Sequence, residues 1–146
     1  MQRADSDVAG LGLPAATASL EQFREFVLAE AEARGLPAAM SAKLDLVLEE
    51  ALVNVINYAY PDGQGMIHVA CYQAGEGGSR QVCVRIEDSG PPFDPFARED
   101  PDISVGMEER SVGGLGIYFI KEMADEARYD RENDKNVLTF CFSAGA

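Results

Sequence analysis

The hydrophobic pattern of this chain changes its period at Pro61-Asp62-Gly63, and this change restricts the fold more than any other feature. Before it, over residues 16–60, apolar residues recur three or four positions apart, which places them on one side of a helix. After it, the apolar residues fall into short β-rich runs of strand length. The sequence therefore predicts a helical first part and a sheet-forming second part within one α/β domain.

Two helices are expected before the change. The first covers about residues 16–34 and stops at Gly35-Leu36-Pro37, since glycine and proline end helices. Ser41 can cap the second helix, which runs to about Tyr60. The core stripe of the second helix consists of apolar residues at helical spacing, namely Leu44, Val47, Leu48, Ala51, Leu52, Val55 and Ala59.

The remaining elements are short. Strands are expected at 8–14, 66–73, 81–88, 127–130 and 137–142, and a helix opened by glycines at 117–124. Residues 91–112 are rich in Pro, Asp, Glu and Gly, and irregular segments of this length are often lids over a site. The order β-α-α-β-β-lid-α-β-β predicts an α/β two-layer sandwich.

Charge and composition exclude several classes of function. The formal net charge of −13 argues against binding to DNA, RNA or an anionic membrane, and it suits either a basic protein partner or simple solubility. Neither a signal-peptide pattern nor a run of ~20 apolar residues is found. We therefore expect one cytoplasmic domain over residues 1–146, in which Cys71, Cys83 and Cys141 are small buried apolar side chains.

Three short motifs contain chemistry that a core does not need. Glu50 and Asn54 are four residues apart, so they project together from the second helix, and their oxygens suit Mg²⁺. Asp88 ends an apolar strand, and its carboxylate can accept a hydrogen bond from an adenine amino group. Glycines at 113–116 precede a helix, whose free N–H groups favour phosphate. Taken singly, these motifs are explained as well or better by a solvated helix face, an ordinary turn and a packing requirement.

In this order, the three motifs resemble the GHKL superfamily of gyrase-like ATPases, histidine kinases and their relatives. The details resemble the anti-sigma-factor serine/threonine kinases: Glu50-Ala51-x-x-Asn54, Asp88-x-Gly90-Pro91-Pro92-Phe93, and Gly113-Gly114-Leu115-Gly116. The resemblance covers about residues 11–142. It implies the histidine-kinase-like fold, with a mixed, mostly antiparallel sheet and helices on one face, an ATP lid at about 91–112, and ATP and Mg²⁺ as cofactors.

The resemblance also implies a role for each matching residue. Glu50 is the expected general base, which takes a proton from the attacking hydroxyl. Arg24 is the nearest match to an arginine with which the family contacts its partners. The expected ligand contacts are Asn54 to Mg²⁺, Asp88 and Gly90 at the adenine, Gly114 and Gly116 at the phosphates, and Thr139 as a polar contact near the adenine.

The implied function is that of a protein-serine kinase and anti-sigma factor. Such a protein binds a sigma factor in one state and phosphorylates a serine of a STAS-domain antagonist in another, usually as a homodimer. The alternative is an ATP-binding switch that sequesters a partner without phosphate transfer, although Glu50 favours the kinase because binding alone needs no base. A gyrase-type ATPase fits less well, since it needs a second domain, and a histidine kinase needs a phosphoacceptor on a helix, whereas His68 lies in an expected strand.

Overall fold

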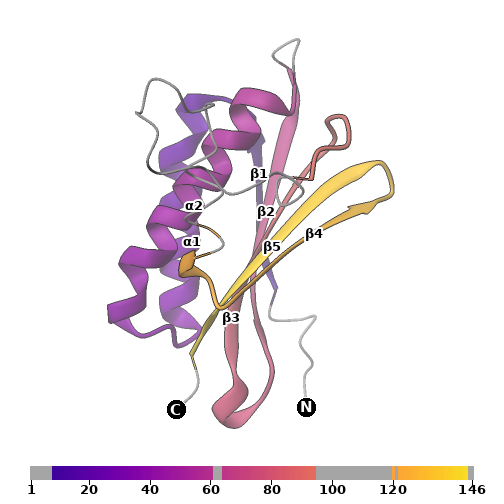
Figure 1. Ribbon diagram of the computed structural model, residues 1–146. Coiled ribbons are helices and arrows are strands. Elements are labelled where there is room, and N and C mark those ends of the chain that lie inside the picture. Colours follow the sequence, from indigo (N-terminus) through magenta and orange to yellow (C-terminus); the bar gives the residue numbers. More distant parts are fainter. Residues whose placement is uncertain (1–7, 61–63, 95–119, 121, 145–146) are drawn as a thin grey trace, which may run out of the picture.

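The computed structural model describes residues 8–60, 64–94, 120 and 122–144 (Figure 1). Two helices precede four of the five strands along the chain, and two single 3-10 turns lie at Thr17–Ser19 and Gly77–Ser79. The elements are β1 (Ala9–Pro14), α1 (Leu20–Ala33), α2 (Ala38–Tyr58), β2 (Met66–Ala74), β3 (Gln81–Asp88), β4 (Glu126–Glu132) and β5 (Lys135–Ser143). Ile120, Glu122 and Met123, within the segment expected to form a third helix, are helical.

The strands form one sheet in the order β1-β2-β3-β5-β4, and α1 and α2 cover one of its faces (Figure 1). This confirms the predicted two-layer α/β sandwich. All four pairings are antiparallel, so the described strands lack the parallel component that a mixed sheet would have.

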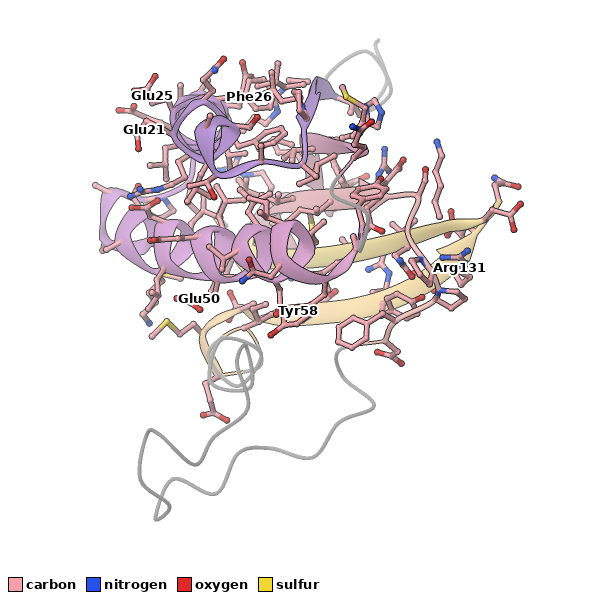
Figure 2. The ribbon with its side chains drawn as sticks, turned by 90° about the horizontal axis from the view of Figure 1, so that it is seen from above. Glu21, Glu25, Phe26, Glu50, Tyr58 and Arg131 are labelled. Atoms are coloured by element: carbon pink, nitrogen blue, oxygen red, sulfur yellow. A yellow bond between two sulfur atoms is a disulfide. The ribbon has the colours of Figure 1, made fainter. Side chains whose placement is uncertain are left out.

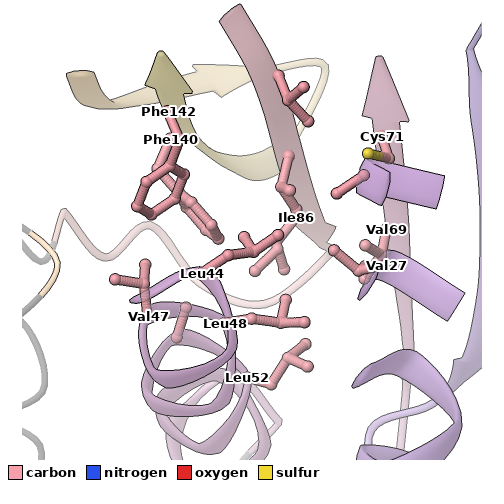
Figure 3. Close-up of a cluster of buried hydrophobic side chains, with 14 of the residues drawn as sticks. Val27, Leu44, Val47, Leu48, Leu52, Val69, Cys71, Ile86, Phe140 and Phe142 are labelled. Atoms are coloured by element: carbon pink, nitrogen blue, oxygen red, sulfur yellow. The ribbon is translucent and has the colours of Figure 1, made fainter. Parts of the chain in front are cut away.

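The core lies between the helices and the sheet (Figure 3). Alternate residues of each central strand point toward the helices, as the two-residue period of a strand requires. The predicted stripe of α2 is confirmed, since all its members are buried except Val55, which is partly buried. The strands meet it with large side chains that include Val69, Ile86, Phe140 and Phe142.

The start of α2 differs from the prediction. The helix begins at Ala38, and its N-cap is Pro37, which has an extended backbone with φ −61° and ψ 144°. Ser41 therefore lies inside the first turns and does not cap the helix. The φ angle that proline fixes already suits a helix entry, so no capping side chain is required at Ser41.

The three cysteines are all buried, as predicted, but two of them are bonded. Cys71 faces the helices and is a free thiol. Cys83 and Cys141 are register partners on β3 and β5, with 4.1 Å between their Cα atoms, and they form a disulfide. The interpretation of these two as unbonded apolar side chains is therefore wrong, because it did not include the cross-strand register.

None of the helices in the described part of the chain is both long and apolar enough to cross a membrane. His68 lies on β2, as predicted, and its side chain is exposed on the sheet face away from the helices.

Candidate functional site

A cleft lies between the C-terminal half of α2 and the ends of β3 and β5. Its lining residues are Ala51, Asn54, Val55, Tyr58, Ala59, Ile86, Asp88, Phe93, Tyr129, Asn136 and Leu138. A largely apolar wall with a few convergent polar groups is typical of a site for a small molecule or cofactor.

Asp88 brings a carboxylate to this cleft at the end of β3, where it is only 6% exposed. Its Oδ1 accepts hydrogen bonds from the backbone N–H of Gly90, at 2.9 Å, and from Nδ2 of Asn136, also at 2.9 Å. Among the described residues, Oδ2 has no hydrogen-bond donor. The carboxylate is thus held by one oxygen and has the other available to accept from a ligand in the cleft.

Gly90 must be glycine because the chain passes against the end of α2. A Cβ added there would lie 2.2 Å from the carbonyl oxygen of Ala59, far inside the contact distance. Its own carbonyl accepts from Arg131, which Figure 2 shows on the hairpin of β4 and β5. The hydroxyl of Tyr60 accepts from the N–H of Ser89, at 2.8 Å, so the turn after β3 is fixed on two sides.

Asn136 is a functional candidate that the sequence analysis missed. It is the register partner of Asp88 across β3 and β5, and it is 7% exposed. No signal in the sequence indicates this pairing, because no short turn sets the register of β3 against β5. Thr139, which the resemblance places near the adenine, is instead the register partner of Arg85. It lies on the sheet face away from the helices and does not line the cleft.

Asn54 lies on the wall of the cleft that α2 forms, and it is 8% exposed. Its Oδ1 is buried and has no hydrogen-bond partner among the described residues. An unsatisfied buried acceptor costs about 1–3 kcal/mol, so such atoms are rare in folded proteins. An amide oxygen suits Mg²⁺, which takes oxygen ligands and keeps several waters. The residue therefore fits the Mg²⁺ site that the resemblance implies.

Glu50 is half-buried one helical turn before Asn54, and Figure 2 shows it with Tyr58 on the side of α2 away from α1. Burial raises the pKa of the Glu50 carboxyl, and the neighbouring Glu49 charge raises it further. A carboxylate with a raised pKa is a stronger base than an ordinary glutamate. The described residues contain no cluster of three or more His, Cys, Asp or Glu that could hold a metal ion, so a cation there would depend on few protein ligands.

Other predicted features lie elsewhere. Gly114, Gly116 and most of the proposed lid at 91–112 fall outside the described residues, which end at Asp94 and resume at Ile120. Arg24, the expected partner-contact residue, forms a bidentate ion pair with Asp45, both distances being 2.8 Å. This hydrogen bond lowers the pKa of the Asp45 carboxyl.

The fold and the cleft together define the class. A two-layer sandwich whose long second helix and sheet edge border an apolar cleft, with a buried carboxylate and a buried amide oxygen that has no partner among the described residues, has the architecture of a GHKL-type nucleotide-binding domain. The histidine kinase-like ATPase domain family matches residues 13–142, nearly the whole sequence, and the chain belongs to this family.

Similar proteins bear out the resemblance seen in the motifs. The chain is 27% identical over 103 residues to the serine/threonine-protein kinase BtrW of Bordetella bronchiseptica, covering 70% of each. It is 26% identical over 104 residues to the serine-protein kinase RsbW of Listeria monocytogenes, and covers 62% of that protein.

Among solved structures, the RsbU and RsbW domains of Rv1364c from Mycobacterium tuberculosis share the fold, with a TM-score of 0.64 and 17% identity. That alignment covers 93% of this chain, which spans about a third of the Mycobacterium protein (32%).

Proposed function

We propose that this chain binds ATP with Mg²⁺ in the cleft and transfers the γ-phosphate to a serine of a partner protein. One observation carries the proposal: the buried Oδ1 of Asn54 has no partner among the described residues, and it lies one turn from a half-buried Glu50 whose pKa is raised. A cation ligand and a strengthened base are thus adjacent on one helix. The names of the similar proteins, both serine kinases, support the same reaction.

The described residues divide the work of the proposed reaction. Asp88 accepts a hydrogen bond from the adenine amino group, and Asn54 holds the metal. When bound, Mg²⁺ neutralises charge on the phosphates, which is the main requirement of phosphoryl transfer. Glu50 takes the proton of the serine hydroxyl while the serine oxygen bonds to the γ-phosphorus. The bond from that phosphorus to the β–γ bridging oxygen breaks, and ADP leaves.

The proposed partners are those that the motif resemblance to the anti-sigma-factor kinases implies. We propose a STAS-domain antagonist as the phosphate acceptor and a sigma factor as the alternative partner, with the chain acting as a cytoplasmic homodimer in a partner-switching module. The acidic chain, with a net charge of −13, suits a basic partner surface. Gly114 and Gly116 are proposed to admit the phosphates, and residues 91–112 are proposed to form the ATP lid.

A transfer assay tests the proposal. Purified chain, radiolabelled ATP, Mg²⁺ and a STAS-domain protein from the same organism are combined, and label on the STAS protein is measured. General-base catalysis contributes about 10²–10⁴-fold, so Glu50→Gln should lose at least about 100-fold in rate while ADP affinity stays unchanged. The matched control is Glu76→Gln, an exposed glutamate between β2 and β3, at the other end of β3 from Asp88.

Each outcome has a definite meaning. A normal rate in Glu50→Gln would refute the base assignment. Tight ATP binding by the wild type without any transfer would favour the alternative, an ATP-dependent switch that sequesters its partner.

A further inference from the structure

The side chain of Asn136 uses all of its hydrogen-bonding groups at one end of the cleft. Its Nδ2 donates to Oδ1 of Asp88 and to the carbonyl of Pro91, each at 2.9 Å. Its Oδ1 accepts from the backbone N–H of Phe93, at 3.1 Å, and from the hydroxyl of Tyr129. Three acceptors face the amide nitrogen, the third being the carbonyl of Gly90 at a longer 3.5 Å, and two donors face the amide oxygen, so the orientation of the amide is fixed by its neighbours.

This arrangement determines how Asp88 presents its carboxylate. The terminal torsion of an aspartate is broad, so an unrestrained carboxylate would rotate its plane and present its oxygens in varying directions. Here the donors from Gly90 and Asn136 converge on Oδ1. Oδ2 is consequently the oxygen available to a ligand in the cleft, and it has no hydrogen-bond donor among the described residues. A ligand with a donor at that point completes the carboxylate's hydrogen bonds.

From these contacts we infer that Asn136 is a positioning residue that sets the base preference of the cleft. By holding Oδ1 of Asp88, it presents Oδ2 to the exocyclic amino group of a 6-aminopurine. A 6-keto purine presents an oxygen at the same place, so two acceptors would face each other without a proton between them. The inference rests on the proposed function, because it concerns the same nucleotide cleft, and it adds the residue that holds the Asp88 carboxylate in the orientation on which the discrimination depends.

Asn136 also ties this preference to the chain that follows β3. The carbonyl of Pro91 and the N–H of Phe93 are both bonded to its amide. The backbone at 91–93 is thus held by the same side chain that orients the carboxylate. Loss of the Asn136 amide removes the restraint on the Asp88 carboxylate and the restraint on the backbone at 91–93 together. The loss of nucleotide affinity should therefore exceed that caused by removing one hydrogen bond at the protein surface.

The test measures affinities for Mg²⁺-ADP and Mg²⁺-IDP, which differ at position 6 of the purine, by calorimetry. In Asn136→Ala, the ratio of the IDP to the ADP dissociation constant should fall by about tenfold or more, since charge-assisted hydrogen bonds are lost. In Asn136→Asp, a second carboxylate beside Asp88 should lower the ratio further. The matched control is Asn133→Asp, the same change in the exposed turn three residues away, where the positive φ of 52° tolerates aspartate.

Because Asn136 is buried, thermal unfolding of each variant accompanies the binding data, and Asn136→Ser provides a smaller change that keeps a hydroxyl. A purely structural role would weaken both nucleotides equally and leave the ratio at its wild-type value. If the wild type prefers ADP and the variants remain folded, an unchanged ratio would overturn this inference and leave the proposed function standing. A wild type that binds neither nucleotide would overturn both.

Discussion

Replacing Gly90 with alanine should damage the fold and the cleft together. The new Cβ would lie 2.2 Å from the carbonyl oxygen of Ala59, 2.9 Å from its carbonyl carbon and 3.0 Å from its Cα. These are backbone atoms at the end of α2, so no flexible side chain can move aside, and one segment must shift by about 1 Å to reach ordinary contact distance. Overpacking of this kind costs about 1–3 kcal/mol.

That cost translates into a measurable change. For a domain of this size, 1 kcal/mol corresponds to about 2–4 °C, so Gly90→Ala should lower the unfolding temperature by about 2–12 °C. The matched variant is Gly78→Ala, because a Cβ at Gly78 meets no atom within 4 Å. ADP affinity should also fall in Gly90→Ala, since Ala59 and Asp88 both line the cleft. If calorimetry gave the two variants equal unfolding temperatures and equal ADP affinities, the assigned close approach would be incorrect.

Three further predictions concern titration and cysteine chemistry. The rate of phosphate transfer should fall as the pH is lowered, with a midpoint above the ordinary glutamate pKa, because Glu50 must be deprotonated and its pKa is raised. Glu49→Gln removes a charge that raises this pKa, so it should move the midpoint to lower pH. A midpoint that does not move refutes the effect of Glu49 on Glu50. The Cys83–Cys141 disulfide spans 58 residues of sequence, so its reduction should lower the free energy of unfolding by up to about 4 kcal/mol, and urea titrations with and without reductant should therefore differ. Burial raises the pKa of the Cys71 thiol to about 11, so the native protein at pH 8 should not react with a thiol reagent until it unfolds, and reaction in the native state would contradict this.

The secondary structure was predictable because each element has a strong local signal. The stripe from Leu44 to Ala59 follows the helical period, and the structure buries it as expected. The turn at Asn133-Asp134 was predictable for a similar reason, since both residues tolerate the positive φ values that a two-residue hairpin needs. Boundaries were less certain, and the N-cap at Pro37 was missed because Ser41 offers the more familiar capping side chain.

Contacts between β3 and β5 were not predictable, because the two strands are far apart in the sequence. β4 and β5 are joined by two residues, which fixes their register locally. β3 and β5 are separated in sequence by the long segment after Asp88 and by the whole of β4, so no turn fixes which residues face each other. The pairing of Asp88 with Asn136 and the Cys83–Cys141 disulfide both depend on that register. The motif resemblance, which carries no register, placed Thr139 near the adenine, and Asn136 was missed.

The features at the cleft are difficult to explain by folding alone. Within the described part of the chain the oxygen of the Asn54 amide is buried without a partner, which opposes stability by about 1–3 kcal/mol, and an apolar side chain there would avoid this cost. Burying Glu50 beside Glu49 also disfavours its ionised form, as the raised pKa shows. Both groups lie one turn apart on the same helix, beside a cleft whose far end holds a carboxylate oriented by Asn136. The proposed cation and nucleotide would satisfy the oxygen of Asn54 and the second oxygen of Asp88 together, which would supply the hydrogen-bonding partners that the described part of the chain lacks.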